Sequence, residues 1–78
     1  MVIRKWQKSG EFVEIEECYS GDIEGPALIV SSNAFAPGQM FIEWREQVPL
    51  SDRQGCQRLV ESVRRWTESH GYTQIPTD

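Results

Sequence analysis

The residues best suited to chemistry in this chain are two cysteines, Cys18 and Cys56, and a single histidine, His70. Two thiols and one imidazole do not supply the four ligands of a structural zinc site. No nucleophile stands near a base at a spacing that would indicate covalent catalysis. We therefore expect no metal site, no cofactor and no enzymatic activity.

Cys56 and His70 also have plain structural interpretations. Cys56 falls on the apolar side of a predicted helix, where a cysteine behaves as a small hydrophobic residue, although the first turn of a helix can activate a thiol. His70 falls at the end of the same helix, where an imidazolium interacts favourably with the helix dipole. We interpret the first as a core residue and the second as a cap.

Phosphate binding is the other chemistry that the residue types suggest, through four arginines of the predicted helix: Arg53, Arg58, Arg64 and Arg65. A nucleic-acid-binding or regulatory domain that uses them is our alternative hypothesis. However, Glu61–Arg65 and Arg64–Glu68 are spaced four residues apart, which is typical of a solvated helix face. The formal net charge of −4 also disfavours a nucleic-acid partner.

Acidic residues are concentrated in residues 11–24, which contain six of them and no basic residue: Glu11, Glu14, Glu16, Glu17, Asp22 and Glu24. Strand alternation places Glu14 and Glu16 on one outward face, and Asp22 and Glu24 follow in a loop. We interpret these four as a docking surface for a basic partner. The alternative is an ordinary solvated edge of the protein.

The first two strands are predicted at residues 2–8 and 11–19, joined by a turn at Ser9-Gly10. A symmetric turn places Trp6 opposite Val13 and Lys5 opposite Glu14. One face then carries the apolar residues Val2, Trp6, Val13, Ile15 and Tyr19, and we expect it to be the core face. The opposite face carries Ile3, Phe12 and Cys18 among charged residues.

Two further strands are predicted at residues 27–32 and 39–47, with a turn at Pro37-Gly38 between them. Residues 72–75 could add a short fifth strand. The facing of residues 39–47 stays open, because one residue more or less in the preceding loop moves Phe41 or Trp44 to the other face.

A helix is predicted from an N-cap at Ser51, with Gln54 completing a capping box, to a stop at Gly71. Its apolar stripe comprises Cys56, Leu59, Val60, Val63, Trp66 and Thr67. We expect the core to join Leu59, Val63 and Trp66 to the hairpin residues Trp6, Val13 and Ile15.

The sequence therefore predicts one α+β domain over residues 1–78: a four-stranded, mostly antiparallel sheet of two hairpins with a C-terminal helix on one face. One helix covers only one face, so apolar residues remain for an interface. Phe12 and Phe41 are candidates on the sheet, and Phe35 is a candidate in a loop.

The predicted function is a small acidic, non-enzymatic protein-binding module, inhibitor or accessory subunit that occupies a surface of a larger protein. Compact acidic inhibitors encoded by mobile elements against host defence or nucleic-acid machinery fit this description by analogy. The predicted partner-binding residues are Phe12, Glu14, Glu16, Asp22, Glu24, Phe35 and Phe41. Self-association through the open sheet face is a second mode.

The expected location is the cytoplasm. Two cysteines are too few for a disulfide framework, and residues 1–6 contain no long apolar run of a signal peptide. No stretch approaches the length of a membrane-spanning helix, so we expect no membrane partner.

Overall fold

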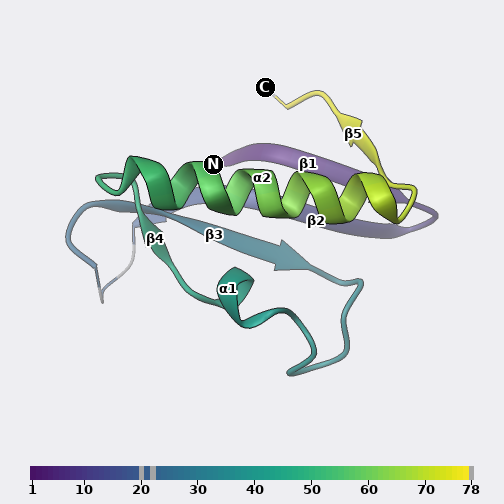
Figure 1. Ribbon diagram of the computed structural model, residues 1–78, viewed down its shortest axis with the longest axis horizontal. Coiled ribbons are helices and arrows are strands. Elements are labelled where there is room, and N and C mark those ends of the chain that lie inside the picture. The colour runs from purple at the N-terminus through teal and green to yellow at the C-terminus, as the bar shows by residue number, and fades with distance from the viewer. Residues whose placement is uncertain (20, 22, 78) are drawn as a thin grey trace.

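The computed structural model describes residues 1–19, 21 and 23–77. Within these residues, five strands form one antiparallel sheet in the order β4-β3-β2-β1-β5: β1 (Val2–Lys8), β2 (Glu11–Tyr19), β3 (Pro26–Ser32), β4 (Val48–Pro49) and β5 (Thr73–Ile75). The long helix α2 (Arg53–Ser69) crosses one face of the sheet, and the short helix α1 (Ile42–Arg45) lies beside α2 (Figure 1). The predicted α+β fold, an antiparallel sheet with a C-terminal helix on one face, is confirmed.

The hairpin of β1 and β2 has the predicted register. Trp6 lies opposite Val13 and Lys5 lies opposite Glu14. The turn needs left-handed backbone at two positions, Ser9 at φ 47° and Gly10 at φ 86°, which suits glycine at the second of them. Trp6 and Val13 face α2 and are at most 1% exposed.

A bulge near the N-terminus reverses the facing of the first residues. The pairing shifts between Val2 and Arg4, so that Val2 lies opposite Glu16. The extra residue moves Val2 to the face of Glu16, while Ile3 packs against the core. The prediction that Val2 faces the core and Ile3 faces outward was therefore wrong.

Residues 39–47 do not form the predicted fourth strand, which was wrong. They contain α1, and the sheet continues only at β4. The carbonyl of Phe41 accepts hydrogen bonds from the backbone N–H groups of Trp44 and Arg45, at 3.0 and 3.2 Å. One helical turn places Phe41 and Trp44 on the same side, whereas a strand would place them on opposite faces.

The helix α2 begins one residue later than predicted. Its N-cap is Asp52, not Ser51, and the Asp52 carboxylate accepts a hydrogen bond from the Gly55 N–H at 2.9 Å. Ser51 belongs instead to the turn that connects β4 to the helix. The predicted end is correct, because His70 is the C-cap and Gly71 follows at φ 81°.

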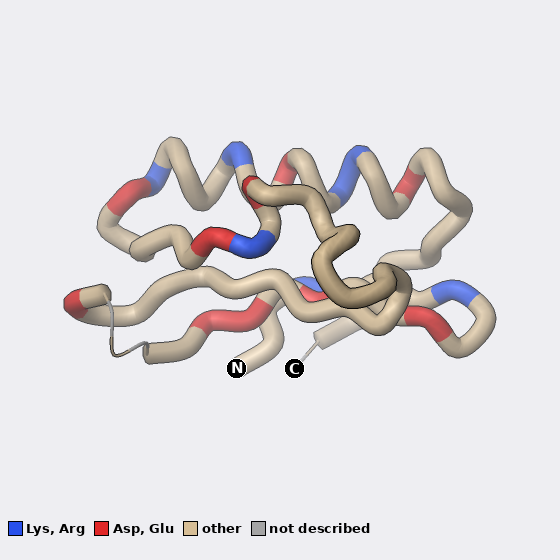
Figure 2. The backbone as a smooth tube through the Cα atoms, turned by 90° about the horizontal axis from the view of Figure 1, so that it is seen from below, with Lys and Arg blue, Asp and Glu red and all other residues tan. Residues whose placement is uncertain are grey.

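The core lies between α2 and one face of the sheet, and it joins residues of five elements and of the segment after α2: Trp6, Val13, Ile15, Leu28, Val30, Trp44, Leu59, Val63 and Tyr72. Trp66 is half-buried against it. Tyr19, which was predicted on the core face, is 82% exposed at the last position of β2, so that prediction was wrong. The opposite sheet face is covered by no element in the described part of the chain (Figure 2).

Candidate functional site

Four aromatic side chains pack together where α1 meets α2: Phe35, Phe41, Trp44 and Trp66. Trp44 is at the centre of the cluster. Its ring centroid lies 5.2 Å from Phe41, 5.5 Å from Trp66 and 5.8 Å from Phe35, with interplanar angles of 77° to 88°. These edge-to-face contacts are the preferred geometry of aromatic pairs, so the cluster fixes α1 against α2.

Above this cluster runs an open groove of about 1020 Å³ between α1 and α2. We call it the aromatic groove. Its floor is formed by aromatic side chains and its long wall by one side of α2; the lining residues are Phe41, Glu43, Trp44, Gln54, Gln57, Arg58, Glu61, Ser62, Arg65, Trp66 and Ser69. The Trp44 indole N–H donates to the Ser62 hydroxyl at 3.0 Å, which joins the floor to the wall.

The rim of the groove exposes an aromatic side chain just before α1. Phe41 lines the groove and is 42% exposed. Phe41 is nevertheless held in place by its contacts with Trp44 and Trp66. A partly exposed aromatic ring on a rigid support is typical of an interface anchor, because little conformational entropy is lost when it is covered.

The arginines in the C-terminal half of α2 are already paired with glutamates of the same helix. Arg64 is bound to both Glu61 and Glu68, the second at 3.1 Å, and Arg65 contacts Glu61 through Nε at 3.1 Å. Arg64 donates hydrogen bonds to the Glu61 carboxylate, and this interaction lowers the pKa of Glu61 and raises the pKa of Arg64. The Glu61–Arg65 and Arg64–Glu68 pairs expected from spacing are present.

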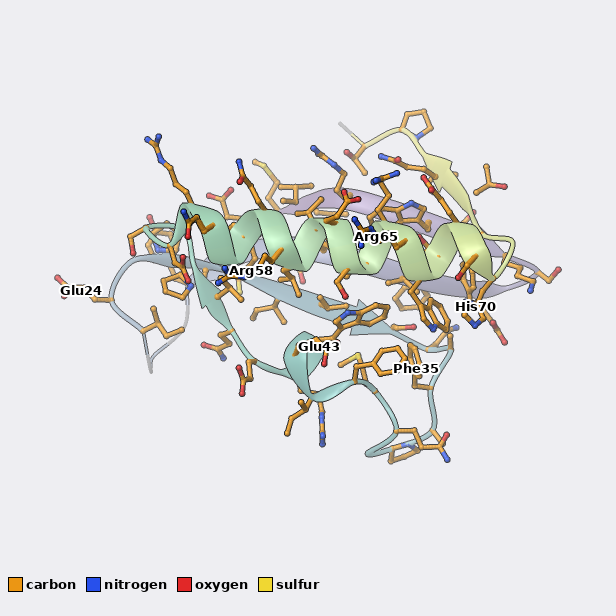
Figure 3. The ribbon with its side chains drawn as sticks, in the orientation of Figure 1. Glu24, Phe35, Glu43, Arg58, Arg65 and His70 are labelled. Carbon is orange, nitrogen blue, oxygen red and sulfur yellow. The ribbon has the colours of Figure 1, made fainter. Side chains whose placement is uncertain are left out.

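Arg58 and Arg65 face the groove with unused hydrogen-bond donors. Arg58 forms no ion pair with any residue that the structure describes, and Arg65 uses only its Nε atom. Glu43 stands on the α1 side of the groove and is likewise without an ion pair among the described residues. Figure 3 shows Arg58 and Arg65 along α2 and Glu43 on α1 beside it. The long wall therefore carries Arg58 and Arg65 with Glu61 between them, and the short wall carries Glu43.

A smaller hollow of about 480 Å³ adjoins the groove toward β4 and shares Glu43, Arg58 and Ser62 with it. Gln47 also lines this hollow, and its buried side-chain oxygen has no hydrogen-bond partner in the described part of the chain.

The uncovered side of the sheet, which we call the sheet face, carries Lys5, Phe12, Glu14 and Glu16. The Lys5 ammonium lies 3.6 Å from Glu14 and 5.7 Å from the centroid of the Phe12 ring. The terminal amine lies 3.9 Å from Glu16. These contacts partly neutralise the two acidic residues, and all four side chains are only half-exposed.

The predicted partner-binding residues fall into two separate groups. Phe12, Glu14 and Glu16 lie on the sheet face, whereas Phe35 and Phe41 belong to the aromatic cluster on the other side. Figure 3 places Glu24 at the end of the molecule opposite Phe35. Asp22 lies outside the described residues. The structure thus does not assemble these residues into one site.

The four arginines of the alternative hypothesis are likewise divided. Arg58 and Arg65 line the aromatic groove, Arg64 is bound between two glutamates, and Arg53 begins α2 outside the groove. Trp44 and Trp66, which form the floor, were not among the predicted site residues. The spacing of Met40, Phe41 and Trp44 at three and four residues was the available signal for a helical turn there.

Cys56 and His70 occupy structural positions. The Cys56 thiol donates to the Pro49 carbonyl at 3.4 Å, and burial raises the pKa of the thiol, which disfavours the reactive thiolate. The His70 ring stacks on Trp66 at 4.1 Å, and its Nδ1 lies 2.8 Å from the Trp66 carbonyl oxygen.

Among the described residues, no three His, Cys, Asp or Glu side chains are grouped so that they could hold a metal ion. The described helices include none that is long and apolar enough to cross a membrane. Comparison with protein-family models, with curated proteins and with solved structures found no match to this chain.

Proposed function

We propose that this chain is a small non-enzymatic binding module that occupies a surface of a larger protein, as an inhibitor or accessory subunit. The observation that carries the proposal is the aromatic groove, with Phe41 42% exposed at its rim. Buried and half-buried tryptophans hold this ring in position. Aromatic and arginine side chains around such a hollow are the residue types that dominate binding energy in protein interfaces.

The sheet-face acids Glu14 and Glu16, together with Glu24, have a different role in this proposal. They give the molecule a negative potential that accelerates encounter with a partner whose surface is basic overall. Because Glu14 and Glu16 are already near positive groups, their contribution to the bound complex is small. A reducing, cytoplasmic setting is part of the proposal, since Cys18 and Cys56 are both free thiols.

Site-specific photocrosslinking tests this function. A photoreactive phenylalanine analogue at position 41 is compared with the same group at position 19, where Tyr19 is 82% exposed outside the groove. We expect a partner protein of defined mass to be crosslinked from position 41 in lysate of the source organism, and the crosslink to be absent from position 19. Crosslinking from position 19 alone would contradict the proposal.

A second candidate function is nucleic-acid binding through the arginines of α2, favoured by Arg58, which has no ion pair among the described residues, and by Arg65, which binds Glu61 only through Nε. It is less favoured because Arg64 is bound by Glu61 and Glu68. Fluorescence anisotropy with a labelled single-stranded oligonucleotide, measured across salt concentrations, tests it. Binding with a steep salt dependence would support this candidate, and the absence of binding at low salt would exclude it.

A further inference from the structure

The groove restricts the secondary structure of whatever fills it. Its long wall runs from Gln54 to Ser69, which corresponds to about 22 Å along α2. The backbone groups along that wall are hydrogen-bonded within the helix itself, so the groove offers no sheet edge to an extended peptide. The Trp44 indole N–H is not available to an occupant either, because it already donates to the Ser62 hydroxyl. The groove therefore supplies no backbone hydrogen bonds to an occupant, which favours a segment that satisfies its own backbone, as a helix does.

The charges along the groove restrict the sequence of that helix. Arg58 and Arg65 are seven residues apart, which places them on the same side of α2 at a spacing of about 10.5 Å, or two turns. Their free guanidinium donors would be satisfied by two carboxylates at the same spacing on a neighbouring helix. Across the groove, Glu43 would be satisfied by a basic side chain on the other flank.

Resting on the function proposed above, we infer that the aromatic groove binds an amphipathic helix of the partner. The helix presents an apolar stripe to Phe41 and Trp66, acidic residues seven positions apart toward Arg58 and Arg65, and a basic residue toward Glu43. This local pattern is independent of the long-range charge of the sheet face. A second copy of this chain fits less well, because antiparallel pairing of two α2 helices centred on the groove sets Arg58 against Arg65 of the other copy.

A selection from displayed peptides tests the inference without knowledge of the natural partner. The probe is a library of random peptides of about 15 residues, long enough to span the groove when helical, selected against the intact chain. We expect enriched sequences with apolar residues at helical spacing and Asp or Glu seven positions apart. Enrichment of proline-rich or alternating extended sequences would overturn the inference.

Charge exchange then tests the two arginines directly. R58E/R65E should lower the affinity for an enriched acidic peptide by about twofold to thirtyfold, as expected for the loss of two solvent-accessible ion pairs. The same variant should bind the counterpart peptide with Lys in place of the two acids more tightly than wild type does. The matched control is R4E/R53E, which changes the net charge equally at two exposed positions outside the groove and should leave both affinities unchanged.

F41S separates failure of this inference from failure of the proposed function. If F41S abolishes peptide binding while R58E/R65E has no effect, the groove is a binding site and only the charge pattern is wrong. If F41S leaves peptide binding intact, the proposed site itself is wrong. Sedimentation equilibrium of the free chain tests the remaining alternative, in which a second copy fills the groove. A dimer that F41S dissociates would identify a second copy as the occupant and overturn the inference.

Discussion

At the scale of single residues, the capping role of Asp52 explains why a glycine stands at position 55. The Asp52 carboxylate caps α2 by accepting the Gly55 N–H, and a Cβ at position 55 would collide with that carboxylate and lie 3.1 Å from Val48 Cγ1. The glycine in the first turn of α2, which weakens an ordinary helix, here makes room for the cap. Sequence reasoning identified a capped helix start correctly but chose Ser51, because side-chain type alone does not distinguish two adjacent capping residues.

We predict that Gly55→Ala destabilises the protein by about 1 kcal/mol, although alanine favours a helix, because the substitution displaces the capping carboxylate. Urea denaturation of wild type, Gly55→Ala, Asp52→Ala and the double variant measures the free energies of unfolding. The double variant should lose less than the sum of the single variants, since both remove the same cap. Gln57→Ala, at an exposed position of α2, is the control. A stabilising Gly55→Ala would contradict this account.

Tyr72 couples stability to alkaline pH. Its hydroxyl donates to Glu11 at 2.6 Å, and burial together with this carboxylate raises the pKa of Tyr72 to about 12, from its ordinary value of 10.0. The unfolded chain therefore releases the phenolic proton at lower pH than the folded chain. The stabilisation is complete below about pH 10 and falls as the pH approaches 12.

We predict that the free energy of unfolding of wild type decreases over this window by at most about 1.4 kcal/mol per pH unit, the limit for one proton. Tyr72→Phe should remove the part of this decrease that comes from titration of the Tyr72 hydroxyl. Urea denaturation at several pH values between 9 and 12 checks the difference between the two curves. Parallel curves for wild type and Tyr72→Phe would show that Tyr72 does not titrate differently in the folded state.

At the scale of elements, α1 exists because of its neighbours. Four residues are too few for a stable isolated helix. Trp44, which is 1% exposed, packs against Phe35, Phe41 and Trp66 and donates to Ser62. Tertiary contacts therefore override the alternating pattern of residues 39–47 that resembles a strand.

We predict that Trp44→Ala destabilises the protein by about 3–5 kcal/mol, the range for removing a buried aromatic side chain. Amides of residues 42–46 should lose hydrogen-exchange protection more than those of β2. Ile42→Ala, in the same short helix but at a 65% exposed position, should change stability by less than about 0.5 kcal/mol. Equal effects of the two substitutions would contradict the role assigned to Trp44.

Some elements can be predicted from local sequence alone, whereas others depend on contacts with distant parts of the chain. The hairpin register and the apolar stripe of α2 follow from local periodicity. Apolar core residues recur at strand spacing in the hairpin, as at Trp6 and Val13, and at helical spacing in α2, as at Leu59 and Val63. The bulge at Val2, the turn of α1 and the aromatic groove depend on contacts distant in sequence. Residue type alone was enough to identify Phe35 and Phe41 as candidates. It could not show that they share one site with Trp66, because these residues are brought together only by the fold.

At the scale of the whole molecule, the two layers carry different charge patterns. Acidic residues follow one another along β2, whereas on α2 glutamates are interspersed among arginines (Figure 2). In the function proposed above, the acidic layer would act at long range, and the layer with the aromatic groove would act at contact. The formal net charge of −4 is thus unevenly distributed between the two layers.

We predict that the triple variant E14Q/E16Q/E24Q slows association with a basic partner and flattens its salt dependence, while the dissociation rate stays within about twofold of wild type. F41S should instead increase the dissociation rate. Surface plasmon resonance at several salt concentrations, with the partner crosslinked from position 41 as the immobilised protein, measures both rates. An unchanged association rate in the triple variant would mean that the acidic residues only solvate the surface.

The brevity of the outer strands has a consequence for solubility. The sheet ends in β4, with two residues, and β5, with three, and Pro49 in β4 has no N–H to donate. Near the other edge, the Thr77 hydroxyl donates to the Ile3 carbonyl at 3.3 Å. Strands this short offer an incoming chain few backbone groups with which to extend the sheet, so we expect β4 and β5 to limit aggregation through the outer strands.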